Sequence, residues 1–113
     1  MPYIETKLST PLTKEKETVL KNALGKLIEN FPGKTESWLM LNFADNCRMY
    51  FKGSDEPCAM VTISIFGKGS ASAYDKMTAD VCELMAKETG ISPSRIYVKY
   101  EEVSHWGWNG TNF

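Results

Sequence analysis

The first residues of the chain could supply a catalytic base. Methionine aminopeptidases remove Met1 when a small residue such as proline follows, so the processed chain is expected to begin at Pro2 with a free secondary amine. An α-amino group titrates near pH ~8, which suits a general base at neutral pH. Burial in an apolar pocket, or a neighbouring cation such as Lys34, would lower that pKa and leave the amine free to accept a proton. Met-Pro is also a common beginning without catalytic meaning, so this pair alone leaves both interpretations open.

Other chemistries have weak support. His105 is the only histidine and the three cysteines are far apart, so no spacing supplies the ligands of a metal site, and no metal is predicted. A Ser-His-Asp or Cys-His arrangement would have to use His105, and no nucleophile-elbow motif is present. Gly67-Lys68-Gly69-Ser70 ends like a phosphate loop, but Thr62 stands where the first glycine belongs. We therefore expect a turn there.

Composition excludes several classes of protein. The 113 residues are 42% hydrophobic and 24% charged, with a net charge of −1, which is typical of one globular domain and does not favour a nucleic-acid or anionic-membrane partner. No apolar run approaches the roughly 20 residues of a membrane span, and the N-terminus lacks a signal-peptide pattern. The odd number of cysteines without a C-x-x-C motif (Cys47, Cys58 and Cys82) favours a reducing, cytoplasmic compartment.

Periodicity predicts two helices and four strands. After the N-cap residue Thr13, apolar residues recur at helical spacing from Val19 to Phe31, and Pro32-Gly33 ends the pattern. A second helix is predicted from about Ser72 to Glu88, with Gly90 as its stop. Strands are predicted at about 2–8, 38–43, 58–66 and 95–100, with a short strand pair about 49–51.

The order of these elements predicts a duplicated βαβ unit in one domain, 1–113, with halves at about 2–50 and 57–113. The predicted fold class is α/β: a four-stranded mixed sheet with both helices on one face, because right-handed crossovers place them together. The opposite face would carry Met60, Thr62, Ser64 and Tyr97. We expect other copies of the chain to cover it.

Several segments together resemble the macrophage migration inhibitory factor family of the tautomerase superfamily over essentially the full length. They are Pro2 at the start of a strand, Gly33-Lys34, Gly53-Ser54-Asp55-Glu56-Pro57-Cys58-Ala59, Phe66-Gly67-Lys68, Ile91-Ser92-Pro93-Ser94-Arg95-Ile96-Tyr97 and the terminal Gly107-Trp108-Asn109-Gly110-Thr111-Asn112-Phe113. The resemblance implies a homotrimer whose sheets surround a central channel. It also implies keto–enol tautomerisation of small carbonyl compounds, phenylpyruvate-like or dopachrome-like, without a cofactor.

The resemblance also implies roles for individual residues. Pro2 would be the catalytic base and then the acid, and Lys34 would bind the substrate carboxylate or polarise its carbonyl while keeping the Pro2 amine neutral. The backbone of Phe66 would touch substrate, and Tyr97 would come from the neighbouring subunit. An aromatic pocket would be closed by Trp106, Trp108 and Phe113. Each role has an alternative: Lys34 as a solvated lysine at the C-terminal end of the helix, and Tyr97, Trp106 and Phe113 as core of the trimer rather than, or as well as, wall of the pocket.

Three departures from the family pattern carry expectations. Lys99 stands where the family often has a substrate-binding asparagine, so a second cation would favour dicarboxylate-like ligands. Val61 replaces the second cysteine of the C-x-x-C motif that begins at Cys58 in animal members, so thiol-oxidoreductase activity has no support. The segment 101–105 is shortened, which would reshape the rim of the pocket.

Two other functions compete with the tautomerase. The first is a signalling protein that binds a host or self receptor as a cytokine does, with vestigial catalysis and secretion by a leaderless route. The second is hydration or dehalogenation of unsaturated acids, which ranks low because those members typically add arginines and this chain has only Arg48 and Arg95.

Overall fold

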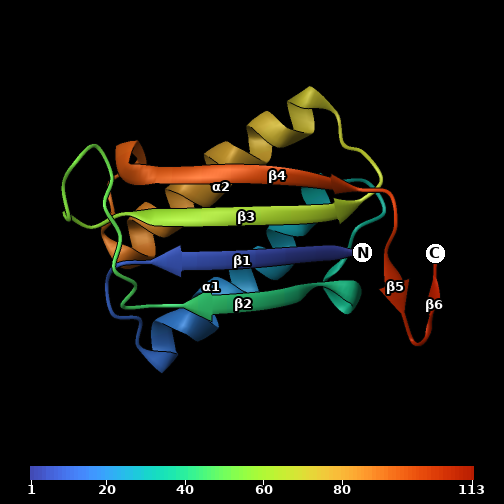
Figure 1. The fold of residues 1–113 in the computed structure, drawn as a ribbon, viewed down its shortest axis with the longest axis horizontal. Helices are drawn as coiled ribbons and strands as arrows, with labels where there is room; N and C mark the ends of the chain where they lie inside the picture. Colours follow the sequence, from blue (N-terminus) through green and yellow to red (C-terminus); the bar gives the residue numbers. More distant parts are fainter.

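A four-stranded mixed sheet carries both α-helices on one face (Figure 1). This computed structural model describes residues 1–113. The strand order is β2-β1-β3-β4, with β1–β2 and β3–β4 parallel and β1–β3 antiparallel. The strands are β1 (Pro2–Leu8), β2 (Met40–Ala44), β3 (Ala59–Phe66) and β4 (Ile96–Val103), and the helices are α1 (Lys14–Leu27) and α2 (Ala71–Thr89). The predicted fold class is confirmed.

The short elements lie around the ends of the sheet. They are the 3₁₀ turns η1 (Ile28–Asn30), η2 (Glu36–Trp38) and η3 (Pro93–Arg95), and the C-terminal hairpin of β5 (Gly107–Trp108) and β6 (Thr111–Asn112). The strand pair expected about 49–51 is wrong: that segment forms only an isolated bridge between Phe51 and Ser54.

Local capping explains where the helices begin and end. The Thr13 side chain accepts a hydrogen bond from the Lys16 amide, and the Ser70 side chain accepts one from the Ala73 amide. Gly90 ends α2 in the left-handed conformation, with φ of 75°. The first helix ends earlier than its apolar pattern predicts, because its last turn, η1, tightens into a 3₁₀ helix.

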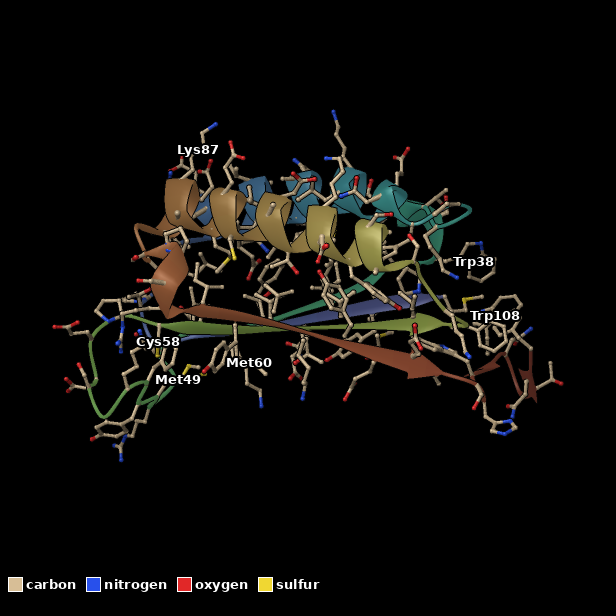
Figure 2. All side chains as sticks on the ribbon, turned by 90° about the horizontal axis from the view of Figure 1, so that it is seen from above. Trp38, Met49, Cys58, Met60, Lys87 and Trp108 are labelled. Atoms are coloured by element: carbon tan, nitrogen blue, oxygen red, sulfur yellow. The ribbon has the colours of Figure 1, made fainter.

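The hydrophobic core lies between the sheet and the two helices. In β3, Ala59, Val61, Ile63 and Ile65 are buried against the helices, as the alternation predicts. Met60 lies on the opposite side of the sheet (Figure 2). That open face also carries the exposed Tyr97, a residue that is 60% accessible in the single chain. No helix of this chain covers it.

Candidate active site

A cavity of about 830 Å³ opens beside the amino terminus. Its walls come from the start of β1, the turn that enters β2, the ends of β3 and β4, and the C-terminal hairpin. Eight of the twelve lining residues are hydrophobic, which suits a small organic ligand. The lining residues are Met1, Pro2, Tyr3, Ser37, Trp38, Leu39, Met40, Ser64, Val103, Trp106, Gly107 and Trp108.

The backbone of Phe66 joins Lys34 to the amino terminus. Lys34 Nζ donates a hydrogen bond to the Phe66 carbonyl oxygen at 3.0 Å, and the Phe66 amide donates to the Met1 carbonyl oxygen, also at 3.0 Å. Lys34 reaches this position because Gly33 turns the chain after η1 in the left-handed region, with φ of 80°. The register of β3 against β1 therefore fixes the distance between the cation and the chain start.

The amino group of Met1 has a lowered pKa in this environment. Burial is the largest cause, because it disfavours the charged ammonium, and the charge and hydrogen bond of Lys34 add to it. A lowered pKa keeps the amine uncharged at a lower pH than an ordinary amino terminus. This is the electrostatic condition that a neutral amine base needs.

Pro2 is buried as the first residue of β1, opposite Ile65 of β3. With Met1 attached, the Pro2 nitrogen is an amide and carries no basic lone pair. Removal of Met1 converts it into a secondary amine that borders the cavity. The sheet position of Pro2 is thus suited to presenting an amine, and the processing of Met1 decides whether one is there.

Aromatic rings form one side of the cavity and continue toward the C-terminus. Trp38 and Trp108 meet edge to face with ring centroids 4.9 Å apart, and Figure 2 shows them together at one end of the sheet. The ring centroid of Phe113 lies 6.2 Å from that of Trp108, in a stacked arrangement, and 5.8 Å from that of Phe66. The Phe113 amide donates to the Trp106 carbonyl oxygen at 3.0 Å, which holds the tail against this group.

Trp38 was not among the residues predicted for the site. It follows Lys34 by four residues, in the turn that precedes β2, and the structure leaves it exposed. The sequence carries no local signal that separates it from a strand residue. The periodicity assigned it to the strand instead, whereas the chain forms η2 there.

The structure does not bring Tyr97 and Lys99 to the cavity of their own chain. Tyr97 pairs with Met60, five residues along β3 from the partner of Pro2, which corresponds to about 17 Å of strand. Lys99 lies on the open face, with its Nζ 4.0 Å from a Glu101 carboxylate oxygen. Neither residue lines the cavity beside Pro2.

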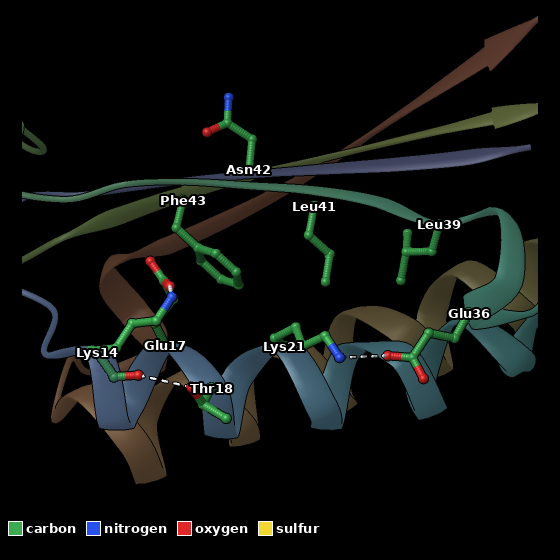
Figure 3. Close-up of a pocket in the computed structure, with 9 residues that line it drawn as sticks. All are labelled: Lys14, Glu17, Thr18, Lys21, Glu36, Leu39, Leu41, Asn42 and Phe43. Carbon is green, nitrogen blue, oxygen red and sulfur yellow. Dashed lines mark hydrogen bonds and ion pairs between the residues drawn. The ribbon is translucent and has the colours of Figure 1, made fainter.

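A second cavity, of about 620 Å³, lies between α1 and β2 (Figure 3). Its charged groups are engaged with one another: Lys21 lies 3.6 Å from Glu36, and Lys14 lies 2.8 Å from Glu17. None of the predicted site residues borders it. The remaining lining residues are Thr18, Leu39, Leu41, Asn42 and Phe43.

No group of three or more His, Cys, Asp or Glu side chains is placed to hold a metal ion. Neither α-helix combines the length and the apolar character needed to cross a bilayer.

A duplicated βαβ sheet with the N-terminal residue beside an aromatic cavity defines the tautomerase-superfamily class of fold. Comparison with known proteins agrees. The family model for macrophage migration inhibitory factor (MIF) matches residues 1–113, and the chain belongs to this family. MIF from Meriones unguiculatus is 28% identical, over 100% of this chain and 99% of the relative.

Two solved structures show the same fold over nearly their whole length. Leishmania major MIF2 superimposes with a TM-score of 0.93 at 37% identity, covering 100% of this chain and 97% of the other. A MIF homologue from Prochlorococcus marinus has a TM-score of 0.84 at 28% identity, covering 98% of each chain. Membership in the family supports a tautomerase or cytokine-like function in general terms.

Proposed function

We propose that this protein is a cofactor-independent keto–enol tautomerase of phenylpyruvate-like or dopachrome-like carbonyl compounds. The observation that carries the proposal is the convergence of three features at one end of the sheet. They are the Met1 amino group, whose pKa is lowered at this end of β1, the Lys34 ammonium held on the Phe66 carbonyl, and a mainly apolar cavity beside Pro2. This combination suits proton transfer to and from a small aromatic carbonyl compound.

In the proposed reaction the neutral Pro2 nitrogen takes a proton from the carbon next to the substrate carbonyl. The electron pair of that C–H bond forms the C=C bond of the enol, and the carbonyl π electrons move to oxygen. The protonated Pro2 amine then gives the proton to the enolate oxygen. In the reverse direction the neutral amine takes the proton from the enol oxygen and returns it to carbon. No electron acceptor is needed, because the substrate is only isomerised.

Lys34 supplies the positive charge of the proposed site. An ammonium has three donor hydrogens, and the Phe66 carbonyl occupies one of them, which leaves two for a substrate carboxylate or for the developing enolate oxygen. The same charge lowers the pKa of the Met1 amino group, and it would likewise oppose protonation of a processed Pro2 amine before substrate binds. The rings of Trp38, Trp108 and Phe113 would contact the aromatic part of the substrate.

We further propose that the site is completed by a neighbouring copy in a homotrimer. Tyr97 and Lys99 lie on the open face of the sheet, away from the cavity of their own chain. Exposed Met40, 67% accessible, and Tyr97 are apolar or amphipathic groups on that face which a second subunit would cover. The neighbour's Tyr97 would then border the Pro2 amine, as the family resemblance implies.

Cytokine-like receptor binding is the second candidate function, favoured by the MIF relatives that match over the whole chain. It would depend on the outer surface rather than on the Pro2 amine. We place the protein in a reducing, cytoplasmic compartment, because Cys47, Cys58 and Cys82 are all free thiols, with leaderless release if it signals.

The test combines intact mass of the purified protein with a phenylpyruvate tautomerisation assay. We expect a chain that lacks Met1 and turns over substrate, and we expect Pro2→Gly to abolish turnover. A matched control inserts alanine between Met1 and Pro2, so that processing leaves Pro2 as an amide within an otherwise unchanged chain. Full turnover in either variant would contradict the base assignment. Receptor signalling that persists in Pro2→Gly would favour the second function.

A further inference from the structure

Arg95 is the most heavily bonded side chain outside the site. Its guanidinium donates to four backbone carbonyl oxygens of one loop: Nε to Pro57 at 3.0 Å, Nη1 to Phe51 at 3.1 Å, and Nη2 to Ser54 at 3.1 Å and to Glu56 at 2.9 Å. The loop joins β2 to β3, so one side chain from η3 holds a segment about 40 residues earlier in the chain.

This loop contains a tight hairpin turn with a definite shape. The Phe51 and Ser54 amides donate to each other's carbonyl oxygens at 2.9 and 3.1 Å. Lys52 and Gly53 between them have φ of 53° and 75°, as type I′ turns require. Each of these two carbonyl oxygens therefore accepts one bond inside the turn and a second one from Arg95.

The ring of Phe51 links Arg95 to Tyr97. The Arg95 guanidinium carbon lies 5.3 Å from the centroid of the Phe51 ring, within the range of a cation–π contact. The Phe51 and Tyr97 ring centroids are 4.7 Å apart. The Tyr97 ring thus packs on the open face against the ring of Phe51. Arg95 contacts Phe51 twice, through the backbone carbonyl and through the face of the ring.

We propose that Arg95 is a positioning residue for the tautomerase site of the neighbouring subunit. By fixing the 51–57 loop, it holds the Phe51 ring against Tyr97 and limits the orientations in which the Tyr97 phenol can approach a Pro2 amine across the interface. This inference rests on the proposed function and its trimer. Within one chain, Tyr97 pairs with Met60, about 17 Å along β3 from Ile65, the residue that pairs with Pro2, so Tyr97 can act only on the Pro2 of a neighbouring copy.

Arginine is required for this task and lysine is not a substitute. Four acceptors spread over residues 51–57 match a planar fork with five donors, whereas an ammonium concentrates three donors at one point. Arg95→Lys keeps the charge and loses the fork. The other arginine, Arg48, is exposed and makes no hydrogen bond through its side chain, so Arg48→Lys is the matched control.

The kinetic test is a double-mutant cycle in the phenylpyruvate assay. We expect Arg95→Lys to lower kcat/KM by roughly 10-fold, because small displacements of a substrate-contacting group are costly. In the Tyr97→Ala background the same change should alter kcat/KM by less than about 2-fold, since Arg95 acts through Tyr97. An equal loss in both backgrounds, no loss at all, or an equal loss in Arg48→Lys would overturn the proposal.

A second measurement does not depend on turnover. NMR of the ring signals of Tyr97 in selectively labelled protein should show broadening or a shift in Arg95→Lys and no change in Arg48→Lys, with the oligomeric state unchanged by sedimentation. If Arg95→Lys disassembles the protein, Phe51→Leu replaces it, because that variant keeps the backbone acceptors and removes only the ring between Arg95 and Tyr97.

The two measurements separate failure of this inference from failure of the proposed function. A processed wild-type protein without turnover refutes the tautomerase, and the NMR comparison then still decides whether Arg95 orders the Tyr97 ring. Normal wild-type turnover with an unperturbed Tyr97 ring in Arg95→Lys refutes the positioning role alone.

Discussion

Replacing Lys34 by methionine removes a positive charge from beside the amino terminus and keeps an unbranched side chain of similar length. Lys34 Nζ donates to the Phe66 carbonyl oxygen at 3.0 Å, and its charge and hydrogen bond both lower the pKa of the Met1 amino group. We expect the same charge to lower the pKa of the Pro2 amine once Met1 is removed. The variant tests two consequences of that contact: the pKa of the base and the affinity for a substrate anion.

The direction of the pH effect follows from the chemistry of the base. The amine accepts a proton only when it is neutral, so kcat/KM rises with pH as the amine loses its proton. Lys34 lowers this pKa, and its removal therefore moves the rising part of the kcat/KM-against-pH profile to higher pH. Burial is the largest cause of the shift at Met1. We expect burial to remain at Pro2 in Lys34→Met, so that the rising part of the pH profile moves only part of the way to that of an ordinary amine.

The size of the rate effect follows from the bond that substrate would lose. A hydrogen bond to a charged group contributes about 1.5–3 kcal/mol, and we expect kcat/KM to fall by about 10- to 150-fold at its pH optimum. Lys34→Arg retains the charge, and the pH at which kcat/KM rises should not change. Lys68→Met removes an exposed lysine two residues beyond Phe66 and serves as the control for the loss of one positive charge from the protein's electrostatic potential.

The assay is the pH dependence of kcat/KM for phenylpyruvate in the processed protein and the three variants. An unchanged rising part of the pH profile in Lys34→Met would refute the claim that Lys34 sets the pKa of the base. An equal fall in Lys68→Met would assign the rate effect to the overall charge of the protein rather than to the contact at Phe66.

Three further predictions concern stability and specificity. Thr6→Val should raise the free energy of unfolding by about 1–2 kcal/mol in urea denaturation, because the Thr6 hydroxyl is buried in the core without a hydrogen-bond partner; a loss would show that the hydroxyl is satisfied. Gly25→Ala should raise the free energy of unfolding by about 1 kcal/mol in a Glu36→Ala background. In the wild type the gain should be smaller, because the new Cβ would meet the Glu36 carboxylate; equal gains in the two backgrounds would contradict this. Lys99→Asn should weaken binding of a dicarboxylate by up to about 5-fold relative to a monocarboxylate, and unchanged affinities by calorimetry would refute a role for that charge.

The elements were predictable wherever one period dominated a long segment. The alternation of apolar residues in β3 and the helix-boundary residues Thr13 and Gly90 are local signals, and the structure follows them. The N-cap Ser70 was not predicted, and it begins α2 one residue earlier than expected. β4 continues to Val103, beyond the predicted end at residue 100, because the partner strand extends to Phe66 and offers it hydrogen bonds. Pairing with a distant strand has no signature in the local pattern.

The site was predictable in part. Pro2, Lys34 and the aromatic tail could be named from residue type and family resemblance, and the structure brings them to one end of the sheet. Trp38 was missed because its turn reads as the start of a strand. The assignment of Tyr97 and Lys99 to a neighbouring copy remains a prediction.

The sequence by itself determined the kinds of group available and the faces on which they lie, since residue type sets the chemistry and the period of two or 3.6 sets the side of a strand or helix. Only the tertiary structure decided which groups meet. Lys34 and Phe66 are 32 residues apart in the chain, and their contact joins the turn after η1 to the end of β3. The antiparallel register of β3 against β1 in turn places Phe66 beside Met1. A shift of one residue in that register would turn the side chains of β3 to the opposite face and take Lys34 away from the amino terminus.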